Sequence, residues 1–306
     1  MLALGLVFDW LKKYFPLILA LLCFSIAGVF VFFSLRLPVL MVVDSSIIQL
    51  YGQDRAKQKT RKLSRSVFRP VISVAVAESA GSDLVAIAVE EAHHNPWAVL
   101  FPYRYLGGAR IYKESNPEMR VLILGNGSRP LELGEIAITH VCSDTERDLY
   151  RAGLCAAYLA GDKKILVFDD ELFPEKQRET LTEGLKARGF MEEPVFLRSY
   201  SNQANYSEIG CVIVAGPASR FLENNLDIPV ILFSWVDPAI TPRVVKLVFD
   251  DSAWSLAARA LKLSARFDSM EEIFLPSETT ILKDRMGKKR YSWKIKSLLR
   301  AKLQKN

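Results

Sequence analysis

An uncharged apolar stretch near the N-terminus constrains this chain more than any other feature of its sequence. Residues 15–35, FPLILALLCFSIAGVFVFFSL, contain no Asp, Glu, Lys or Arg, whereas Lys12 and Lys13 precede them and Arg36 follows. A helix rises about 1.5 Å per residue, so this segment spans roughly 30 Å, the hydrocarbon thickness of a bilayer. The pattern predicts a transmembrane anchor over residues 15–35, behind a short N-terminal segment of residues 1–14.

Three alternatives to a retained anchor fit this stretch less well. A cleaved signal peptide has an apolar region of about 7–15 residues followed by a cleavage site of small residues, and neither condition holds. Cys23 follows Leu21 and Leu22, a poor match to the small residue that a lipoprotein signal needs before its cysteine. A buried core helix rarely stays free of charge over such a length. We therefore expect the helix to be retained.

The charges around the stretch indicate how the anchor is oriented. The two lysines before it, partly offset by Asp9, favour a cytoplasmic N-terminus, whereas Arg36 and Asp44 nearly cancel on the other side. A basic run at residues 55–62 lies further along, but long domains cross a membrane largely regardless of their charge. We expect the protein in the inner (plasma) membrane, with its soluble domain outside the cytoplasm.

The net charge of +6 belongs to the C-terminal tail rather than to the chain as a whole. Residues 283–306 contain ten Lys or Arg and one Asp, which gives this basic tail +9 and leaves −3 for residues 1–282. Half of the residues are hydrophobic and 24% are charged, so a packed core is expected in place of disorder. A mildly acidic folded part does not favour nucleic acid as a partner.

The basic tail has the pattern of an amphipathic helix. Tyr291, Ile295, Leu298, Leu299 and Leu303 recur at helical spacing, and Lys and Arg fill many of the other positions. Such a helix lies on an anionic membrane with its apolar stripe in the interface; the alternative is a frayed, solvated end. The side chains that we expect at that surface are Lys289, Arg290, Trp293, Lys294, Lys296 and Arg300.

From residue 38 onward, short apolar runs alternate with helix-like stretches. The expected strands are residues 39–43, 70–77, 97–101, 119–124, 137–142, 164–168, 194–197, 212–215, 230–233 and 244–249. The expected helices are residues 46–64, 82–92, 105–115, 144–159, 174–188, 219–225 and 253–266. Continuous apolar strands that alternate with helices are typical of parallel sheets covered on both faces. The sequence therefore predicts an α/β fold.

Several short motifs follow one another in a recognisable order. They are Ser143-Asp144 before Arg151–Leu159, Lys163–Phe168, Glu183-Gly184-Leu185 before Gly189-Phe190, Pro229–Phe233 with Asp237, Val245–Asp251, and Glu272–Ile281. In this order they resemble the type I periplasmic-binding-protein superfamily, which includes sugar-binding proteins and the effector domains of lac-repressor-type regulators. The resemblance implies two lobes, each a parallel sheet with helices on both faces. The first lobe would cover residues 38–142 with a returning segment at about 252–282, and the second residues 143–251.

This chain departs from that family at three places. A membrane helix fills the space before residue 38 where a repressor carries its helix-turn-helix, so a DNA-binding repressor is excluded. The family's sugar-binding Asp-Arg is replaced by Gly125-Asn126-Gly127-Ser128-Arg129, and its polar Asn-Asp pair by Gly216-Pro217. Sugar specificity is therefore not transferred to this chain.

Polar and aromatic side chains follow the ends of several expected strands. In open parallel sheets, ligands bind outside the carboxyl ends of the strands, and two such lobes can close on a solute. Aromatic rings offer a flat apolar face, while carboxylate and amide groups pair with hydroxyl or amide groups. Asp44, Asp144 and Asp250 also suit helix N-caps. The candidate ligand-binding residues are Asp44, Tyr103, Asn126, Arg129, Asp169, Trp235, Asp237 and Asp250.

Catalytic and metal-binding patterns are missing from the sequence. The three histidines, His93, His94 and His140, form no H-E-x-x-H motif and no spaced Cys/His set. No G-x-S-x-G elbow occurs, and the three cysteines beyond the anchor form no C-x-x-C pair and are expected to be buried thiols. We expect no enzyme activity, no cofactor and no metal.

These observations favour a membrane-anchored domain that binds or senses a small solute without catalysis. The alternative is a structural or interaction module that keeps the fold without a small ligand, and the substituted motif positions favour that alternative. The sequence names neither the solute nor any transporter or sensor partner.

The anchor can be tested directly. Because a spanning helix is held by its apolar length and not by charge, the full-length protein should remain with membranes through an alkaline carbonate wash and keep its N-terminus. Immunoblotting of the washed pellet and N-terminal sequencing measure both. Release of a shortened mature form into the supernatant would show that residues 15–35 are a cleaved signal.

Overall fold

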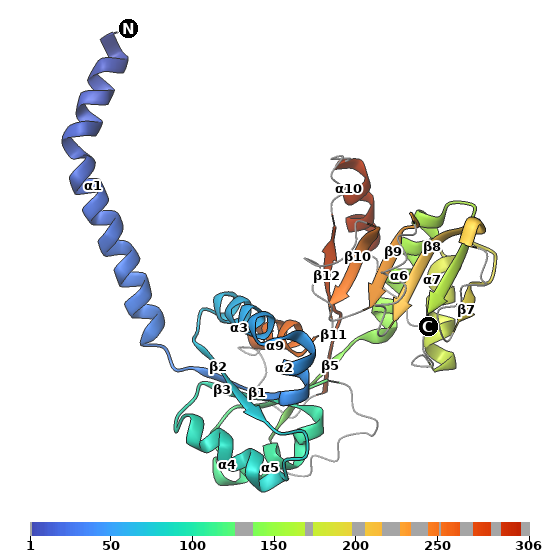
Figure 1. Ribbon diagram of the computed structural model, residues 1–306, viewed down its shortest axis with the longest axis horizontal. Coiled ribbons are helices and arrows are strands. Elements are labelled where there is room, and N and C mark those ends of the chain that lie inside the picture. Colours follow the sequence, from blue (N-terminus) through green and yellow to red (C-terminus); the bar gives the residue numbers. More distant parts are fainter. Residues whose placement is uncertain are drawn as a thin grey trace. The chain divides into compact units, whose positions relative to one another are not determined.

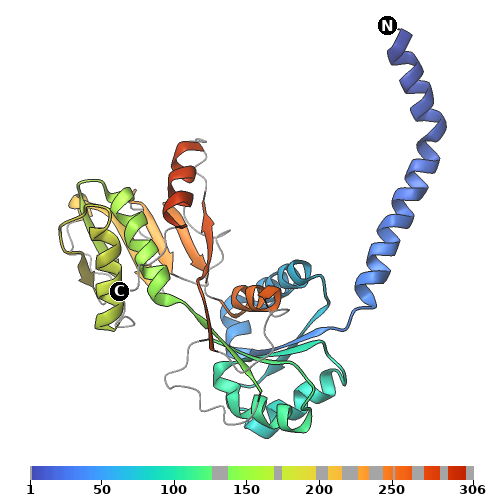
Figure 2. The same cartoon turned by 180° about the vertical axis from the view of Figure 1, so that it is seen from behind.

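A computed structural model describes most of the chain. The described residues are 2–125, 137–168, 174–197, 206–215, 227–233, 244–250, 252–263, 272–282 and 289–300. Their strands form two six-stranded sheets with helices beside them (Figures 1 and 2). The chain divides into two compact units, Met1–Phe101 with Tyr105–Val121, and Pro102–Arg104 with Leu122–Asn306. The predicted α/β fold of two parallel-sheet lobes is confirmed.

The N-terminal helix α1 (Leu2–Ser34) contains the uncharged stretch, with Pro16 inside it. Its segment Tyr14–Phe33 has a mean hydropathy of 2.6, and none of that segment is buried against the rest of the chain. By length and composition, this helix is able to cross a membrane.

The first sheet has the strand order β11-β5-β4-β3-β1-β2. β1 pairs in parallel with both β2 and β3, and β5 pairs in parallel with both β4 and β11. All six residues of β1 are buried, as expected for an interior parallel strand covered on both faces. The strands are β1 (Val39–Asp44), β2 (Val71–Val76), β3 (Ala98–Pro102), β4 (Val121–Leu124), β5 (Thr139–Ser143) and β11 (Glu272–Leu275).

Short helices connect the strands of the first sheet. They are α2 (Ser45–Tyr51), α3 (Gln53–Val67), α4 (Ser82–Ala92), the 3-10 turn η1 (Tyr103–Tyr105) and α5 (Leu106–Ser115). Helices α4 and α5 lie side by side (Figures 1 and 2). The end of α1 is joined to the end of α3, since Arg36 Nη1 donates to the Phe68 carbonyl at 3.1 Å and Arg69 Nη1 donates to the Leu37 carbonyl at 3.2 Å.

The second sheet has the strand order β12-β10-β9-β8-β6-β7, and β12 is antiparallel to β10. The strands are β6 (Lys164–Phe168), β7 (Val195–Leu197), β8 (Ile209–Ala215), β9 (Val230–Phe233), β10 (Val245–Asp250) and β12 (Glu278–Ile281). The helices of this part are α6 (Thr145–Ala160), α7 (Glu175–Lys186), the 3-10 turn η2 (Tyr206–Glu208) and α10 (Lys289–Leu298). Helix α9 (Ala253–Leu263) instead contacts β5 and β11 of the first sheet.

The second sheet buries apolar side chains on both of its faces. One cluster joins alternate strand residues to α6 and α7 and includes Ile165, Val167, Cys211 and Ile213. The intervening residues form a second cluster that includes Leu166, Phe168, Val212 and Val214. Because successive side chains of a strand point to opposite faces, such unbroken apolar strands can only be accommodated by a sheet covered on both sides.

The predicted elements match the observed ones within a few residues, with two differences and one segment that falls outside the described residues. The expected helix 46–64 is two helices, because Gly52 between them has a positive φ of 78° that interrupts helical geometry. The returning segment contributes β11 to the first sheet but β12 to the second. The expected helix at 219–225 lies outside the described residues.

The apolar stripe of α10 is used differently from the prediction. Ile295 is fully buried and Leu299 nearly so, in the same cluster as residues of α6 and α7. The prediction that Ile295 and Leu299 insert into a membrane is therefore wrong, because packing in the core has already removed these two side chains from solvent. Trp293 is 71% exposed. Membrane contact remains a prediction for Trp293 and for Lys289, Arg290, Lys294, Lys296 and Arg300.

Glycines where α6 and α7 cross provide a test of the second lobe. A Cβ atom at Gly184 would collide with the Tyr150 carbonyl oxygen, and one at Gly153 with the Leu181 carbonyl oxygen. Because backbone atoms cannot turn aside, Gly184→Ala should lower the free energy of unfolding by about 1–3 kcal/mol, despite the better helix propensity of alanine. Urea unfolding followed by circular dichroism measures this change.

Gly81→Ala is the control for this test. A Cβ atom at Gly81 meets open space and its φ of −67° suits any residue, so the only expected cost is the poorer N-cap preference of alanine, at most about 1 kcal/mol and less than that of Gly184→Ala. Equal stability of the two variants would contradict the tight helix crossing.

Candidate functional site

Asp44, the first of the predicted ligand residues, ends β1. Its side chain is fully buried, and its Oδ1 accepts hydrogen bonds from the Ser46 amide at 2.8 Å and from the Ser46 hydroxyl at 2.7 Å. This is the N-cap of α2, which pairs an amide that the helix itself leaves free. The cap interpretation of Asp44 is confirmed, and a ligand contact for the same carboxylate stays a prediction.

Two further carboxylates follow strand ends and also bond to nearby amides. Oδ1 of Asp250, at the end of β10, accepts from the Ser252 amide at 3.0 Å, just before α9 begins. Oδ1 of Asp144, after β5, accepts from the Arg147 amide at 3.2 Å and caps α6. Part of the hydrogen-bonding capacity of these groups is therefore used locally.

Tyr103 follows β3 and lies beside a histidine from another strand of the same sheet. Its ring centroid is 5.6 Å from that of His140 on β5, with the ring planes inclined at 38°. This separation is typical of a packed ring pair. Tyr103 is half-buried, so part of its surface remains open to solvent at the carboxyl end of β3.

The other predicted ligand residues cannot be placed in this arrangement. They lie outside the described residues, and their roles stay predictions: Asn126, Arg129, Asp169, Trp235 and Asp237.

A cluster that the sequence did not reveal lies on β5 and β11. His140 and Cys142 point to the same face of β5, and Glu272 of β11 pairs with His140 in the parallel register. His140 Nδ1 is 3.1 Å from Glu272 Oε1, and Cys142 Sγ is 3.4 Å from the same oxygen. The spacing of His140 and Cys142 was a weak signal for one strand face, but Glu272 is brought to them only by strand pairing.

The same pairing of β11 with β5 positions a buried carboxylate, Asp148 of α6. The Ser277 amide donates to Asp148 Oδ2 at 2.6 Å, while Oδ1 lies 3.9 Å from Arg151 Nη1. Burial raises the pKa of Asp148 to about 6, and the hydrogen bonds from Ser277 and the charge of Arg151 oppose this rise only in part.

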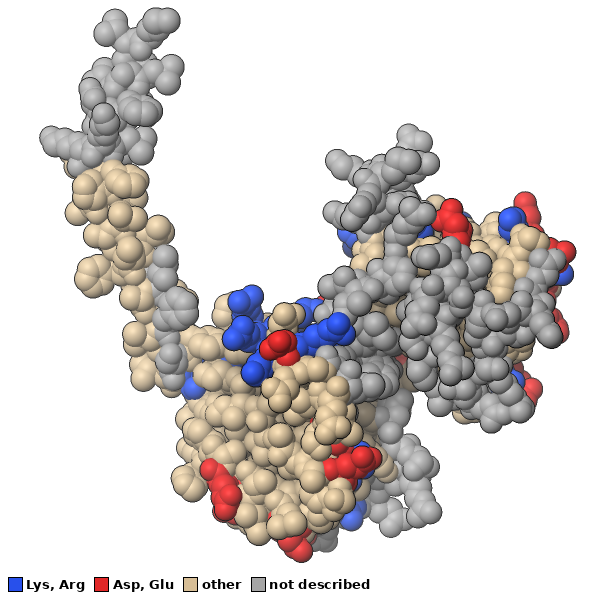
Figure 3. Space-filling model, viewed as in Figure 1, with Lys and Arg blue, Asp and Glu red and all other residues tan. Residues whose placement is uncertain are grey.

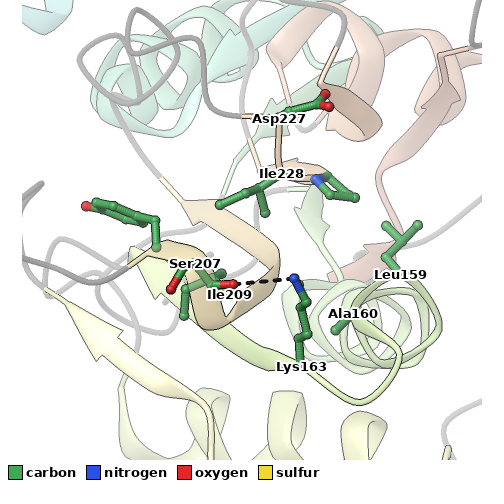
Figure 4. Close-up of a pocket in the computed structure, with 10 residues that line it drawn as sticks. Leu159, Ala160, Lys163, Ser207, Ile209, Asp227 and Ile228 are labelled. Carbon is green, nitrogen blue, oxygen red and sulfur yellow. Dashed lines mark hydrogen bonds between the residues drawn. The ribbon is translucent and has the colours of Figure 1, made fainter.

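A groove of about 490 Å³ lies beside the second sheet, at the amino ends of its strands (Figure 4). Lys163 precedes β6, Ile209 begins β8 and Asp227 comes shortly before β9, so the groove faces the amino ends of these strands. Lys163 Nζ donates to the Ser207 carbonyl at 3.4 Å across it. Ligands of open parallel sheets bind at the carboxyl ends, so this groove is not at the edge where the fold places them.

Basic side chains gather over α3 in the first lobe (Figure 3). The helix carries only one acidic residue, Asp54, and its buried residues are Ala56 and Leu63. The exposed surface of this helix is therefore positively charged and attracts anions. Its basic residues are Arg55, Lys57, Lys59, Arg61, Lys62 and Arg65.

Comparison with known proteins identifies the fold. No protein-family model matches the chain, and no curated protein matches it. A solute-binding protein of an ABC transporter system from Conexibacter woesei is 12% identical with a TM-score of 0.57, covering 86% of this chain and 95% of that one. A LacI transcriptional regulator from a Rhodococcus species is 14% identical with a TM-score of 0.51, covering 81% and 97%.

A third similar structure has a sugar bound. It is a periplasmic solute-binding protein of an ABC transporter from Actinobacillus succinogenes, solved with D-allose, and it is 12% identical with a TM-score of 0.52, covering 81% of this chain and 98% of its own. The chain therefore has the type I periplasmic-binding-protein fold that its motif order resembles. At such low identity the likeness shows the fold alone.

The buried carboxylate makes stability depend on pH. The pKa of Asp148 is about 6 in the folded chain against 3.8 for an ordinary Asp, so between these values the folded state binds more protons than the unfolded state. Stability should therefore fall as pH rises from about 4 to 6, by about 3 kcal/mol, and stay lower above pH 6. Asp148→Asn should remove this fall, as measured by urea unfolding at several pH values.

The matched control is Asp162→Asn, which alters an exposed carboxylate in the turn after α6 and should leave the pH profile unchanged. An Asp148→Asn profile that parallels the original one between pH 4 and 6 would show that Asp148 is not the titrating group.

Proposed function

We propose that this protein is a membrane-tethered, non-catalytic domain that binds or senses a small polar solute. The observation that carries the proposal is its type I periplasmic-binding-protein fold, in which polar and aromatic residues follow the strands at their carboxyl ends. Ligands of open parallel sheets bind at that edge. The half-buried ring of Tyr103, together with the carboxylate and amide side chains expected beside it, suits a ligand with hydroxyl or amide groups.

The similar structures support a small solute as the ligand class. Two of the three are solute-binding proteins of ABC transporters, and one holds D-allose. A sugar is therefore the first class to test, although residues 125–129 differ from the sugar-binding Asp-Arg of the family. Specificity for any one sugar is no part of the proposal.

The membrane tether in the proposal is α1. Its uncharged segment is long enough to span a bilayer, and its end is joined to the first lobe by hydrogen bonds from Arg36 and Arg69. These contacts support a domain held beside the bilayer. We place this domain outside the cytoplasm, because the lysines before α1 favour a cytoplasmic N-terminus.

A second candidate function is an interaction module that keeps the fold without a small ligand. Two observations favour it, since two carboxylates predicted to contact a ligand accept local hydrogen bonds: Asp44 from Ser46 in the first turn of α2, and Asp250 from the Ser252 amide before α9. The two functions differ in ligand retention, which mass spectrometry of small molecules released from the purified full-length protein measures. Absence of a retained molecule, with no thermal shift from any of a panel of neutral sugars, would favour the interaction module.

The retained solute should depend on the carboxyl edge of the second sheet. Asp237→Ala should weaken binding by about 1–3 kcal/mol, which is roughly 5- to 150-fold, because a ligand group would lose the hydrogen-bond partner that the sequence predicts for it. Asp227→Ala, which alters the groove at the amino ends of the strands, is the matched control and should leave affinity unchanged. Calorimetry measures both. Weakening by Asp227→Ala alone would move the ligand to the groove of Figure 4 and contradict the assignment.

A further inference from the structure

Three side chains of different chemistry converge where β5 and β11 pair. The imidazole of His140, the thiol of Cys142 and the carboxylate of Glu272 each offer one atom to a group in which all such atoms lie within 4.8 Å of one another. His140 and Cys142 are buried, while the Glu272 side chain is 50% exposed. The group is therefore anchored in the sheet and open to solvent on one side, which gives an ion a route to it.

The positions of these side chains are set by rigid elements. His140 and Cys142 are two residues apart on β5, so they share a face of the sheet, and Glu272 lies opposite His140 on the neighbouring strand. Side chains on strands are held in a better-defined geometry than side chains on loops. The imidazole is held further by the Tyr103 ring beside it.

The hydrogen bond made by His140 Nε2, the imidazole nitrogen that would not bind the ion, favours metal binding at Nδ1. His140 Nε2 lies 2.8 Å from the carbonyl oxygen of Gly125, which can only accept, so Nε2 carries the proton. In neutral imidazole, Nδ1 then carries a lone pair that faces the Glu272 carboxylate oxygen at 3.1 Å, so a proton or a cation has to lie between these two acceptors. Histidines that bind metals typically donate their other N–H to a carbonyl or carboxylate in this way.

The distances between the three donor atoms match a tetrahedral site. For zinc bonds of about 2.0–2.3 Å, a tetrahedron separates its ligand atoms by about 3.4–3.6 Å. Here Nδ1 and Oε1 are 3.1 Å apart, Sγ and Nδ1 are 3.5 Å apart, and Sγ and Oε1 are 3.4 Å apart. The three atoms thus form a triangle of the size that one face of the coordination shell requires.

We propose that His140, Cys142 and Glu272 form a binding site for a divalent metal ion of the zinc class, with a fourth position open to water. Nitrogen, sulfur and oxygen donors together suit Zn²⁺, which accepts all three, and do not suit Mg²⁺ or Ca²⁺, which prefer oxygen alone. The metal joins β5 to β11 and so connects segments that are 130 residues apart in the chain.

Metal binding changes two features of the cluster. Cys142 Sγ lies 3.2 Å from Nε2, closer than to Nδ1, so the thiol or the imidazole has to rotate before both donors face one ion. The thiol also releases its proton to solvent when the sulfur binds the metal as thiolate. Burial and the neighbouring Glu272 raise the pKa of Cys142 to about 12, so the cysteine stays a neutral thiol until a metal binds.

The test uses the full-length protein in detergent, purified without a polyhistidine tag and stripped of metal by a chelator. Titration with Co²⁺, a spectroscopic substitute for Zn²⁺, should produce the near-ultraviolet absorption of a thiolate–metal bond. Competition with a chromophoric chelator gives the Zn²⁺ stoichiometry and affinity, with one ion expected per chain. Zn²⁺ should also raise the midpoint of thermal unfolding, because it binds only the folded cluster.

Two variants separate the metal site from a cluster held by hydrogen bonds alone. Cys142→Ser should abolish the thiolate absorption, and Glu272→Gln should weaken Zn²⁺ binding at least about tenfold, since even the outer contacts of metal ligands have effects of that size. The Glu272 side chain is half exposed, so its variant is expected to fold even if Cys142→Ser does not. Cys23→Ser and Glu193→Gln, at exposed positions, are the matched controls and should behave as the original chain.

The Zn²⁺ stoichiometry and affinity of the variants decide between the two interpretations. One Zn²⁺ per chain, lost or weakened in the two cluster variants and retained in the controls, supports the site. Absence of the thiolate absorption, or a Zn²⁺ affinity that Glu272→Gln leaves unchanged, overturns it and identifies the cluster as a hydrogen-bonded group.

Discussion

The parallel pairing of β11 with β5 is the contact on which much of the described structure depends. It returns a late segment of the chain to the first sheet, next to the strand that leads into α6. The start of α6 is held by this pairing, since the Asp144 amide donates to the Leu275 carbonyl at 2.9 Å and the Ser277 amide donates to Asp148. Glu272 reaches His140 through the same register. Parallel strands so distant in sequence can pair only when the intervening chain has folded, because its folding brings the two strands together.

Burial of the sheets on both faces limits where polar chemistry can occur. Strands such as β1 and β9 are almost entirely apolar, so polar side chains concentrate at the ends of strands or on edge positions. At these ends the chain also has to start helices, and the carboxylates of Asp44 and Asp144 serve that need as the N-caps of α2 and α6. Stabilisation of the fold and the proposed recognition of a ligand thus depend on the same few side chains.

Two apolar segments of the chain are treated in opposite ways. None of the described segment Tyr14–Phe33 of α1 is buried against the rest of the chain, and by length and composition this helix is able to cross a membrane. The stripe of α10 has similar side chains at helical spacing, yet Ile295 and Leu299 are packed beside α6 and α7. The two helices differ in apolar area, because a stripe can be covered by one neighbouring element, whereas a helix that is apolar all round has to be surrounded on every side by a protein core or by lipid.

The sequence by itself determined the elements and their class. Hydrophobic periodicity located β6, β9 and α4 to the residue, and the unbroken apolar strands implied parallel sheets, because both signals are local. The helix caps at Asp44 and Asp144 could also be predicted from the sequence, since a capping side chain and the amide that it accepts from lie two or three residues apart. Tertiary structure decided what depends on distant partners: that β12 joins the second sheet, that α10 packs into a core, and that Glu272 meets His140 and Cys142. The physical reason is that strand pairing and core packing join residues a hundred or more positions apart, and no local pattern records which partner a side chain will meet.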